Sequence, residues 1–153
     1  MDKIYNHNRD AKPFKFGKEA DNALATLKNL NQVIDAVNAS GGIYKAGMIL
    51  SGHKVVMVSL GEAVYYDPTN DSNIGKHLGI TLHAAVAGDD VSVADEGVVN
   101  NPGWGLIQDA IYYIAPIGGI TSIVPTSGVL QRVGVAIDPD NLKIDFSEPI
   151  SLI

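Results

Sequence analysis

The sequence contains no cysteine among its 153 residues, which excludes disulfide bonds, thiol catalysis and thiolate-ligated metals. It also has no apolar run of the roughly 18 residues that a membrane-spanning helix needs. The first 20 residues are polar and lack the apolar core of a secretory signal. We therefore expect a soluble, unprocessed chain with no membrane partner. Its length predicts one domain that buries most of its surface without covalent cross-links.

Basic residues are scarce, with 11 Lys and Arg against 17 Asp and Glu, and the net charge is −6. Because nucleic-acid binding needs clustered positive charge, we expect no nucleic-acid partner. The few basic residues are concentrated at the beginning, where residues 1–19 hold five basic and three acidic side chains. A mildly basic segment therefore precedes an acidic body.

That basic segment also carries three aromatic residues, which are uncommon in a terminus that contacts only solvent. We predict that residues 1–18 form an extended attachment arm that orders on a partner's surface through Tyr5, Arg9, Lys12, Phe14 and Phe16. A flexible, solvated terminus is the alternative interpretation.

Residues 19–40 have the apolar period of a helix, and Ser40-Gly41-Gly42 follows as a stop signal. The apolar seam is narrow, which favours contact between copies of the same helix over packing on a broad globular core. We predict a coiled coil between copies of this helix, with the oligomer interface at Ala23, Leu27, Leu30, Ile34 and Val37. A single amphipathic helix on its own sheet is the alternative.

From Ile43 onward, apolar runs of about five residues recur at roughly ten-residue spacing, punctuated by Gly and Pro. This pattern predicts a mostly β domain over residues 43–153, an antiparallel β-sandwich or barrel. We expect strands at 55–60, 77–86, 91–93, 111–115, 120–124, 129–137 and 142–146. Nothing in the pattern chooses between one closed barrel and two packed sheets.

This β-rich region contains an internal repeat. Ala63-Val64-Tyr65-Tyr66 recurs as Ala110-Ile111-Tyr112-Tyr113, and residues 78–82 recur as residues 133–137, each followed by an acidic turn and a short strand. We therefore predict a duplicated strand unit with halves at about 43–99 and 100–153. The second copy is eight residues longer, which places a distinctive loop between Ile114 and Leu130. Because the two copies share no reactive side chain, the repeat indicates a structural scaffold and not a site of chemistry.

Catalytic patterns are missing. The histidines have no metal-ligand spacing, Gly-x-Ser-x-Gly is absent, and the adjacent carboxylates of Asp89-Asp90 and Asp95-Glu96 should point to opposite faces of their strands. We expect no catalytic residue, cofactor or metal ligand. Two turns, residues 67–73 and 138–141, are rich in the oxygen ligands that calcium prefers. Neither turn matches a calcium-loop template.

Aromatic residues supply the remaining candidates for binding. Trp104 is the only tryptophan and stands between glycines, which suits a sugar-stacking platform, an interface anchor or a plug at a barrel end. In each tyrosine pair one ring should face inward and the other outward. We take Trp104, Tyr66 and Tyr113 as candidate ligand or interface residues.

Trp104-Gly105-Leu106, Gly118-Gly119-Ile120-Thr121 and the stretch 131–137 (QRVGVAI) together form a familiar pattern. The stretch Val98–Phe146 resembles a module of tailed-bacteriophage virion proteins, found in head decoration proteins, head fibres and tail or collar fibres. The resemblance implies a homotrimer without cofactor or catalysis. It departs at Ile107-Gln108-Asp109, where a Pro-Gly turn is more usual, and it does not cover residues 1–38.

We therefore expect a non-enzymatic virion protein that assembles in the host cytoplasm as a homotrimer. Its role would be that of a capsid decoration (cement) or head-fibre protein, with the major capsid protein or another virion protein as its partner. The alternative is a tail or collar fibre protein that binds a cell-surface glycan. A small β-barrel enzyme is a third hypothesis, disfavoured by the missing catalytic patterns.

Overall fold

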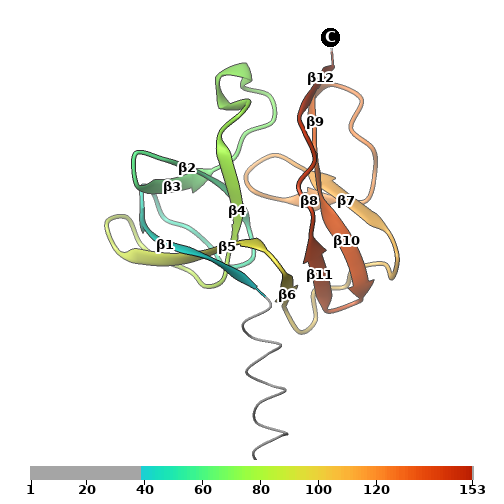
Figure 1. The fold of residues 1–153 in the computed structure, drawn as a ribbon, viewed down its shortest axis with the longest axis horizontal. Coiled ribbons are helices and arrows are strands. Elements are labelled where there is room, and N and C mark those ends of the chain that lie inside the picture. Colours follow the sequence, from blue (N-terminus) through green and yellow to red (C-terminus); the bar gives the residue numbers. More distant parts are fainter. Residues whose placement is uncertain (1–38, 153) are drawn as a thin grey trace, which may run out of the picture. The chain divides into compact units, whose positions relative to one another are not determined.

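The computed structural model describes residues 39–152, which form strands and connecting loops with one 3₁₀ turn, η2 (Asp71–Asn73) (Figure 1). The predicted mostly β class is confirmed. In chain order the strands are β1 (Ser40–Ala46), β2 (Val55–Ser59), β3 (Glu62–Tyr65), β4 (His77–Thr81), β5 (Asp90–Glu96), β6 (Val98–Asn100), β7 (Ile111–Ile114), β8 (Ile120–Thr121), β9 (Gly128–Leu130), β10 (Arg132–Asp138), β11 (Asn141–Ile144) and β12 (Ile150–Leu152). The predicted arm and residues 19–38 of the predicted helix lie outside the described residues.

The first five strands form a closed barrel in the order β1-β3-β2-β4-β5, completed by pairing of β1 with β5. Closure leaves the barrel without a free sheet edge. All neighbours are antiparallel except β1 and β3, which run parallel, so the prediction of a purely antiparallel sheet is wrong at this pair. A two-residue turn joins β2 to β3, with positive φ at both Leu60 (+54°) and Gly61 (+81°).

A second, five-stranded sheet follows in the order β6-β11-β10-β7-β8, and β9 pairs with β12 in a two-stranded ribbon. The chain passes from the barrel to this sheet at Gly97, whose positive φ (+90°) lies between β5 and β6. The structure therefore contains both a barrel and a second sheet, two arrangements that the sequence left as alternatives.

The barrel and the second sheet share one hydrophobic core. Its buried members include Val55 and Ile80 of the barrel together with Val99, Ile114 and Val133 of the second sheet. A smaller cluster fills the barrel interior around Val56, Ala63, Val91 and Val93. Two backbone hydrogen bonds add to the junction, from Val55 N to Gly118 O (2.8 Å) and from Val129 N to Pro68 O (2.9 Å). Both involve the segment between Ile114 and Leu130, so the predicted distinctive loop ties the second half to the barrel.

Several predicted element boundaries are wrong. The strand expected at 120–124 ends at Thr121, and the strand expected at 129–137 is two strands, β9 and β10. Ser40-Gly41-Gly42 was expected to end a helix, yet these residues begin β1. Gly41 packs so closely on the Val93 carbonyl of β5 that a Cβ atom would overlap it, and glycine is therefore required by a strand contact instead of a helix cap. The strand predicted at 77–86 ends at Thr81, because the chain there turns toward residues 51–54.

The sequence repeat corresponds to only part of the strand pairing. In both copies the second segment pairs antiparallel with the strand after it, β4 with β5 and β10 with β11. The first segments differ, because β2 separates β3 from β4 whereas β7 pairs directly with β10. The repeated glycines, Gly79 and Gly134, share a physical role, since the neighbouring strand leaves no room for a Cβ atom at either position.

Candidate functional site

Each tyrosine pair has one buried and one half-buried ring, but in opposite order. Tyr66, predicted to face outward, is 1% exposed, so that prediction is wrong, and its neighbour Tyr65 is the half-buried ring. The reason is that β3 ends at Tyr65, so strand alternation does not continue to Tyr66. In the second pair Tyr112 is buried and Tyr113 is half-buried.

The two buried tyrosines differ in how their hydroxyl groups are satisfied. The Tyr112 hydroxyl accepts a hydrogen bond from Ile107 N (2.9 Å), whereas the Tyr66 hydroxyl has no partner within residues 39–152, and burial raises the pKa of Tyr66. An unpartnered buried polar group costs about 1–3 kcal/mol. We expect Tyr66→Phe to raise the free energy of unfolding by about 1 kcal/mol and Tyr112→Phe to lower it by about as much. Urea denaturation measures both, and destabilisation by Tyr66→Phe would show that its hydroxyl is satisfied in solution.

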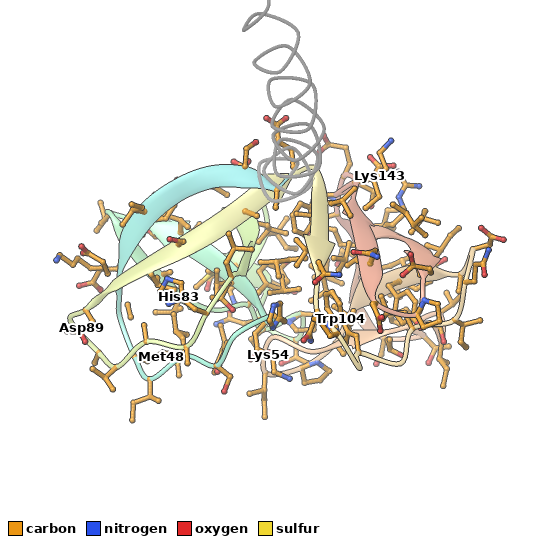
Figure 2. All side chains as sticks on the ribbon, turned by 90° about the horizontal axis from the view of Figure 1, so that it is seen from below. Met48, Lys54, His83, Asp89, Trp104 and Lys143 are labelled. Atoms are coloured by element: carbon orange, nitrogen blue, oxygen red, sulfur yellow. The ribbon has the colours of Figure 1, made fainter. Side chains whose placement is uncertain are left out.

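Trp104 lies at the junction of the barrel and the second sheet, half-buried against the shared core. Its ring stands 5.7 Å from that of His53, tilted by 55°. Figure 2 shows Trp104 beside Lys54, the residue after His53. Burial lowers the pKa of His53 and thereby favours the neutral imidazole. A hydrogen bond with the Asn100 backbone partly offsets this lowering. Because its ring contacts His53, Trp104 belongs to the junction. A sugar ring stacked on the indole would have to share the indole surface with His53.

Side chains in the two oxygen-rich turns form hydrogen bonds within their own turn. Asp67 Oδ1 accepts hydrogen bonds from the backbone and hydroxyl of Thr69, and these bonds lower the pKa of Asp67. Asn141 Nδ2 donates to both carboxylate oxygens of Asp138, which lowers the pKa of Asp138. Turn chemistry accounts for both clusters. Within residues 39–152, no group of three or more His, Asp or Glu side chains is placed to hold a metal.

One concave feature of the described residues is a cleft of about 540 Å³ between the barrel and the second sheet. The start of β4, the end of β5 and residues 146–149 form its walls, and Gln131 also lines it. Its carboxylates Asp95, Glu96 and Glu148 outnumber Lys76. We refer to it as the acidic cleft. The sequence did not predict it, because its walls come from segments that are distant along the chain.

A second concave feature is apolar. A groove of about 360 Å³ runs along the outer face of the second sheet and the β9–β12 ribbon. Ile111, Tyr113, Leu130 and Ile150 line it, beside Arg132, which forms an ion pair with Asp145 (2.9 Å). Tyr113, a predicted interface residue, therefore borders a surface that another protein could cover.

The chain matches no protein-family model and no curated protein sequence. Among the described residues, no helix is both long and apolar enough to cross a membrane. Residues 39–152 form a small barrel-containing β-domain whose surface includes the acidic cleft and the apolar groove.

Proposed function

We propose that this chain is a non-enzymatic structural protein of a tailed-bacteriophage virion, a homotrimeric capsid decoration (cement) or head-fibre protein attached through residues 1–18. The observation that best supports an assembly role is the exposure of aliphatic side chains. Twelve large hydrophobic residues are exposed within residues 39–152, several of them above 70%. Where exposed apolar residues gather on one surface, they favour a protein that is covered by others in its working state.

Leu60 is the clearest case. It is fully exposed (101%) at the tip of the β2–β3 hairpin and has a left-handed backbone (φ +54°). This conformation costs a branched residue about 1–2 kcal/mol, and Asn or Gly normally occupies it. Within residues 39–152, the Leu60 side chain therefore gains no burial that would offset this cost. A partner surface that buries the leucine side chain would explain why the position is aliphatic.

The same end of the barrel presents further aliphatic side chains. Leu50 and Ala85 form an antiparallel bridge, which places the exposed Ile49 and Val86 opposite each other. Two backbone hydrogen bonds connect the end of β1 to its neighbours. Lys45 N donates to Gly61 O in the hairpin (3.0 Å), and Ala46 O accepts from Gly88 N in the loop after Val86 (2.8 Å). These loops, together with the apolar groove, offer extended protein-binding surface.

The alternative, a tail or collar fibre protein with a carbohydrate-binding role, has less support from the site. Tyr66 is buried, and the ring of Trp104 contacts His53. Of the three aromatic residues predicted to bind a ligand, Tyr113 remains, and its surroundings are mostly apolar.

The trimer is tested by light scattering of the full chain. We expect a trimer at micromolar concentration, and we expect Leu30→Asp to dissociate it with strand content intact, because a charge cannot remain in an apolar seam. Asn31→Asp is the matched control, since it adds a charge one residue away from the seam. A monomeric wild type would remove the coiled-coil argument.

The attachment role is tested on particles. Deletion of residues 1–18 should abolish occupancy on the particle surface, as seen by electron microscopy, while the purified variant remains a trimer. Retained occupancy would place the anchor elsewhere in the chain. Loss of the trimer together with occupancy would show that residues 1–18 act in assembly of the oligomer.

A further inference from the structure

The turn between β2 and β3 is an apolar projection from the barrel. Leu60 is fully exposed there, and both Leu60 and Gly61 have left-handed backbone. A Cβ atom at Gly61 would meet no atom within 4 Å, so no described residue packs over this side of the turn. Strained backbone of this kind is concentrated where proteins bind ligands or partners. We refer to Leu60 and Gly61 as the hairpin tip.

A second exposed aliphatic residue also has left-handed backbone, but contacts within the β-domain explain it. Ile117 (φ +57°) precedes Gly118, whose carbonyl accepts a hydrogen bond from Val55 N (2.8 Å). A Cβ atom at Gly118 would come within 2.9 Å of Val55 O. The strained turn at Ile117 therefore packs the second sheet on the barrel. Within residues 39–152, no equivalent contact explains the conformation of Leu60.

The apolar groove on the second sheet has the shape and chemistry to receive such a side chain. Its volume is about 360 Å³, and its apolar lining consists of Ile111, Tyr113, Leu130 and Ile150. The cavity left when one leucine side chain is removed from a protein core is on the order of 150 Å³. The groove therefore has room for Leu60.

Charged side chains at the two features can pair across a contact. Glu62 follows the hairpin tip and Glu148 lines the groove, and both are exposed and form no ion pair within residues 39–152. Each feature also has a cation, Lys45 beside Glu62 and Arg132 in the groove, which already pairs with an aspartate of its own chain. Each unpaired carboxylate can thus face the cation of the other feature, which would fix the register of the contact.

The hairpin tip and the apolar groove lie on different sides of the β-domain. Figure 1 shows β2 and β3 at the left, and β7, β9 and β12 at the right. A contact between a tip and a groove is therefore made by two copies of the chain. Such a contact joins two different surfaces, and it either closes into a ring or continues as a filament. A ring of three copies uses every tip and every groove once.

We propose that the hairpin tip of one copy inserts Leu60 into the apolar groove of the next copy, and that three such contacts close the homotrimer. Leu60 packs there against Tyr113 and Ile150, and the carboxylates and cations described above pair at the rim. The inference rests on the proposed function for the homotrimer, and it adds a contact between β-domains to the predicted helical interface. Burial in the partner copy explains an aliphatic side chain at a strained position.

Cysteine cross-linking of the full chain tests this contact, because the sequence has no cysteine of its own. Leu60→Cys/Ile150→Cys should form disulfides between copies in oxidised glutathione and give a covalent trimer in non-reducing denaturing electrophoresis. A disulfide needs Cα atoms within about 7 Å of each other, so the bond requires a tip seated in a groove. Both substituted residues are exposed, so the fold should persist, and circular dichroism checks this.

Leu60→Cys/Ile117→Cys is the matched control, since its second cysteine replaces an exposed aliphatic residue outside the groove. The groove pair should cross-link at least about tenfold faster than the control pair, because seated cysteines have a high effective concentration. Equal rates in the two pairs, or no cross-link in either, would overturn the contact.

Charge reversal is a second measurement on the same cysteine pair. Adding Glu62→Lys should slow cross-linking at least about threefold at low salt, because it places like charge opposite Arg132, and high salt should reduce the difference. Glu96→Lys reverses an exposed carboxylate outside the tip and the groove, and it should leave the rate unchanged. Equal slowing by both substitutions would overturn the pairing at the rim.

The trimer and the contact fail separately. A trimer in light scattering, combined with no cross-link between residues 60 and 150, would remove the contact and keep the trimer. Cross-linked products that extend beyond three copies would keep the contact and remove the closed ring. A monomeric wild type whose cysteine pair does not cross-link would remove both.

Discussion

Gly134→Ala should lower the free energy of unfolding by at least about 3 kcal/mol, because it overpacks a central strand. A Cβ atom at Gly134 would overlap the Lys143 carbonyl oxygen and come within 2.9 Å of its carbon. The backbone cannot yield easily, since β11 is held between β10 and β6. Urea denaturation followed by circular dichroism measures the loss.

Gly119→Ala is the control for this substitution. A Cβ atom there would lie 3.3 Å from Pro116 O, a contact that a small shift relieves, and the expected change is within about 1 kcal/mol. Wild-type stability of Gly134→Ala would mean that β10 and β11 are further apart than described. Because Gly79 holds the equivalent place in the first copy, the result also tests whether the repeat conserves close packing.

Thr81→Val should cost about 3 kcal/mol although the two side chains have nearly the same shape. Thr81 is fully buried, and its Oγ1 accepts from Lys54 N (3.0 Å) and donates to Ser51 O (2.7 Å). Valine would leave both backbone groups without that partner in a part-buried place. Thermal denaturation measures the effect, and hydrogen exchange should show faster exchange at Lys54.

Thr121→Val provides the comparison, since Thr121 Oγ1 accepts from Ile123 N (3.1 Å) at a more exposed position where water can replace the bond. We expect its effect to stay below about 1 kcal/mol. Equal effects at the two positions would argue that the loop before β2 is not held by Thr81.

Local sequence patterns predicted the strands well and the site poorly. Alternation and turn residues located β2, β7 and β11, because both signals depend on neighbours along the chain. The same signals misread Gly41 and Gly42, since glycine serves a helix stop and a close strand contact equally. They also placed Tyr66 outside, because the end of β3 is one residue earlier than alternation suggests.

The acidic cleft could not be predicted from local patterns. Asp95 and Glu96 were recognisable as a carboxylate pair, but their nearness to Gln131 and Glu148 depends on how the second sheet packs on the barrel.

By itself the sequence determined the β class, the absence of thiol chemistry and the contrast between a basic N-terminal segment and an acidic body, because composition and short-range periodicity carry that information. Only the tertiary structure decided that five strands close into a barrel with one parallel pair, that the repeated segments pair in different orders, and that the exposed carboxylates gather at a cleft. These features depend on contacts between residues tens of positions apart. Such contacts are selected by burial of a shared core, which no single segment specifies.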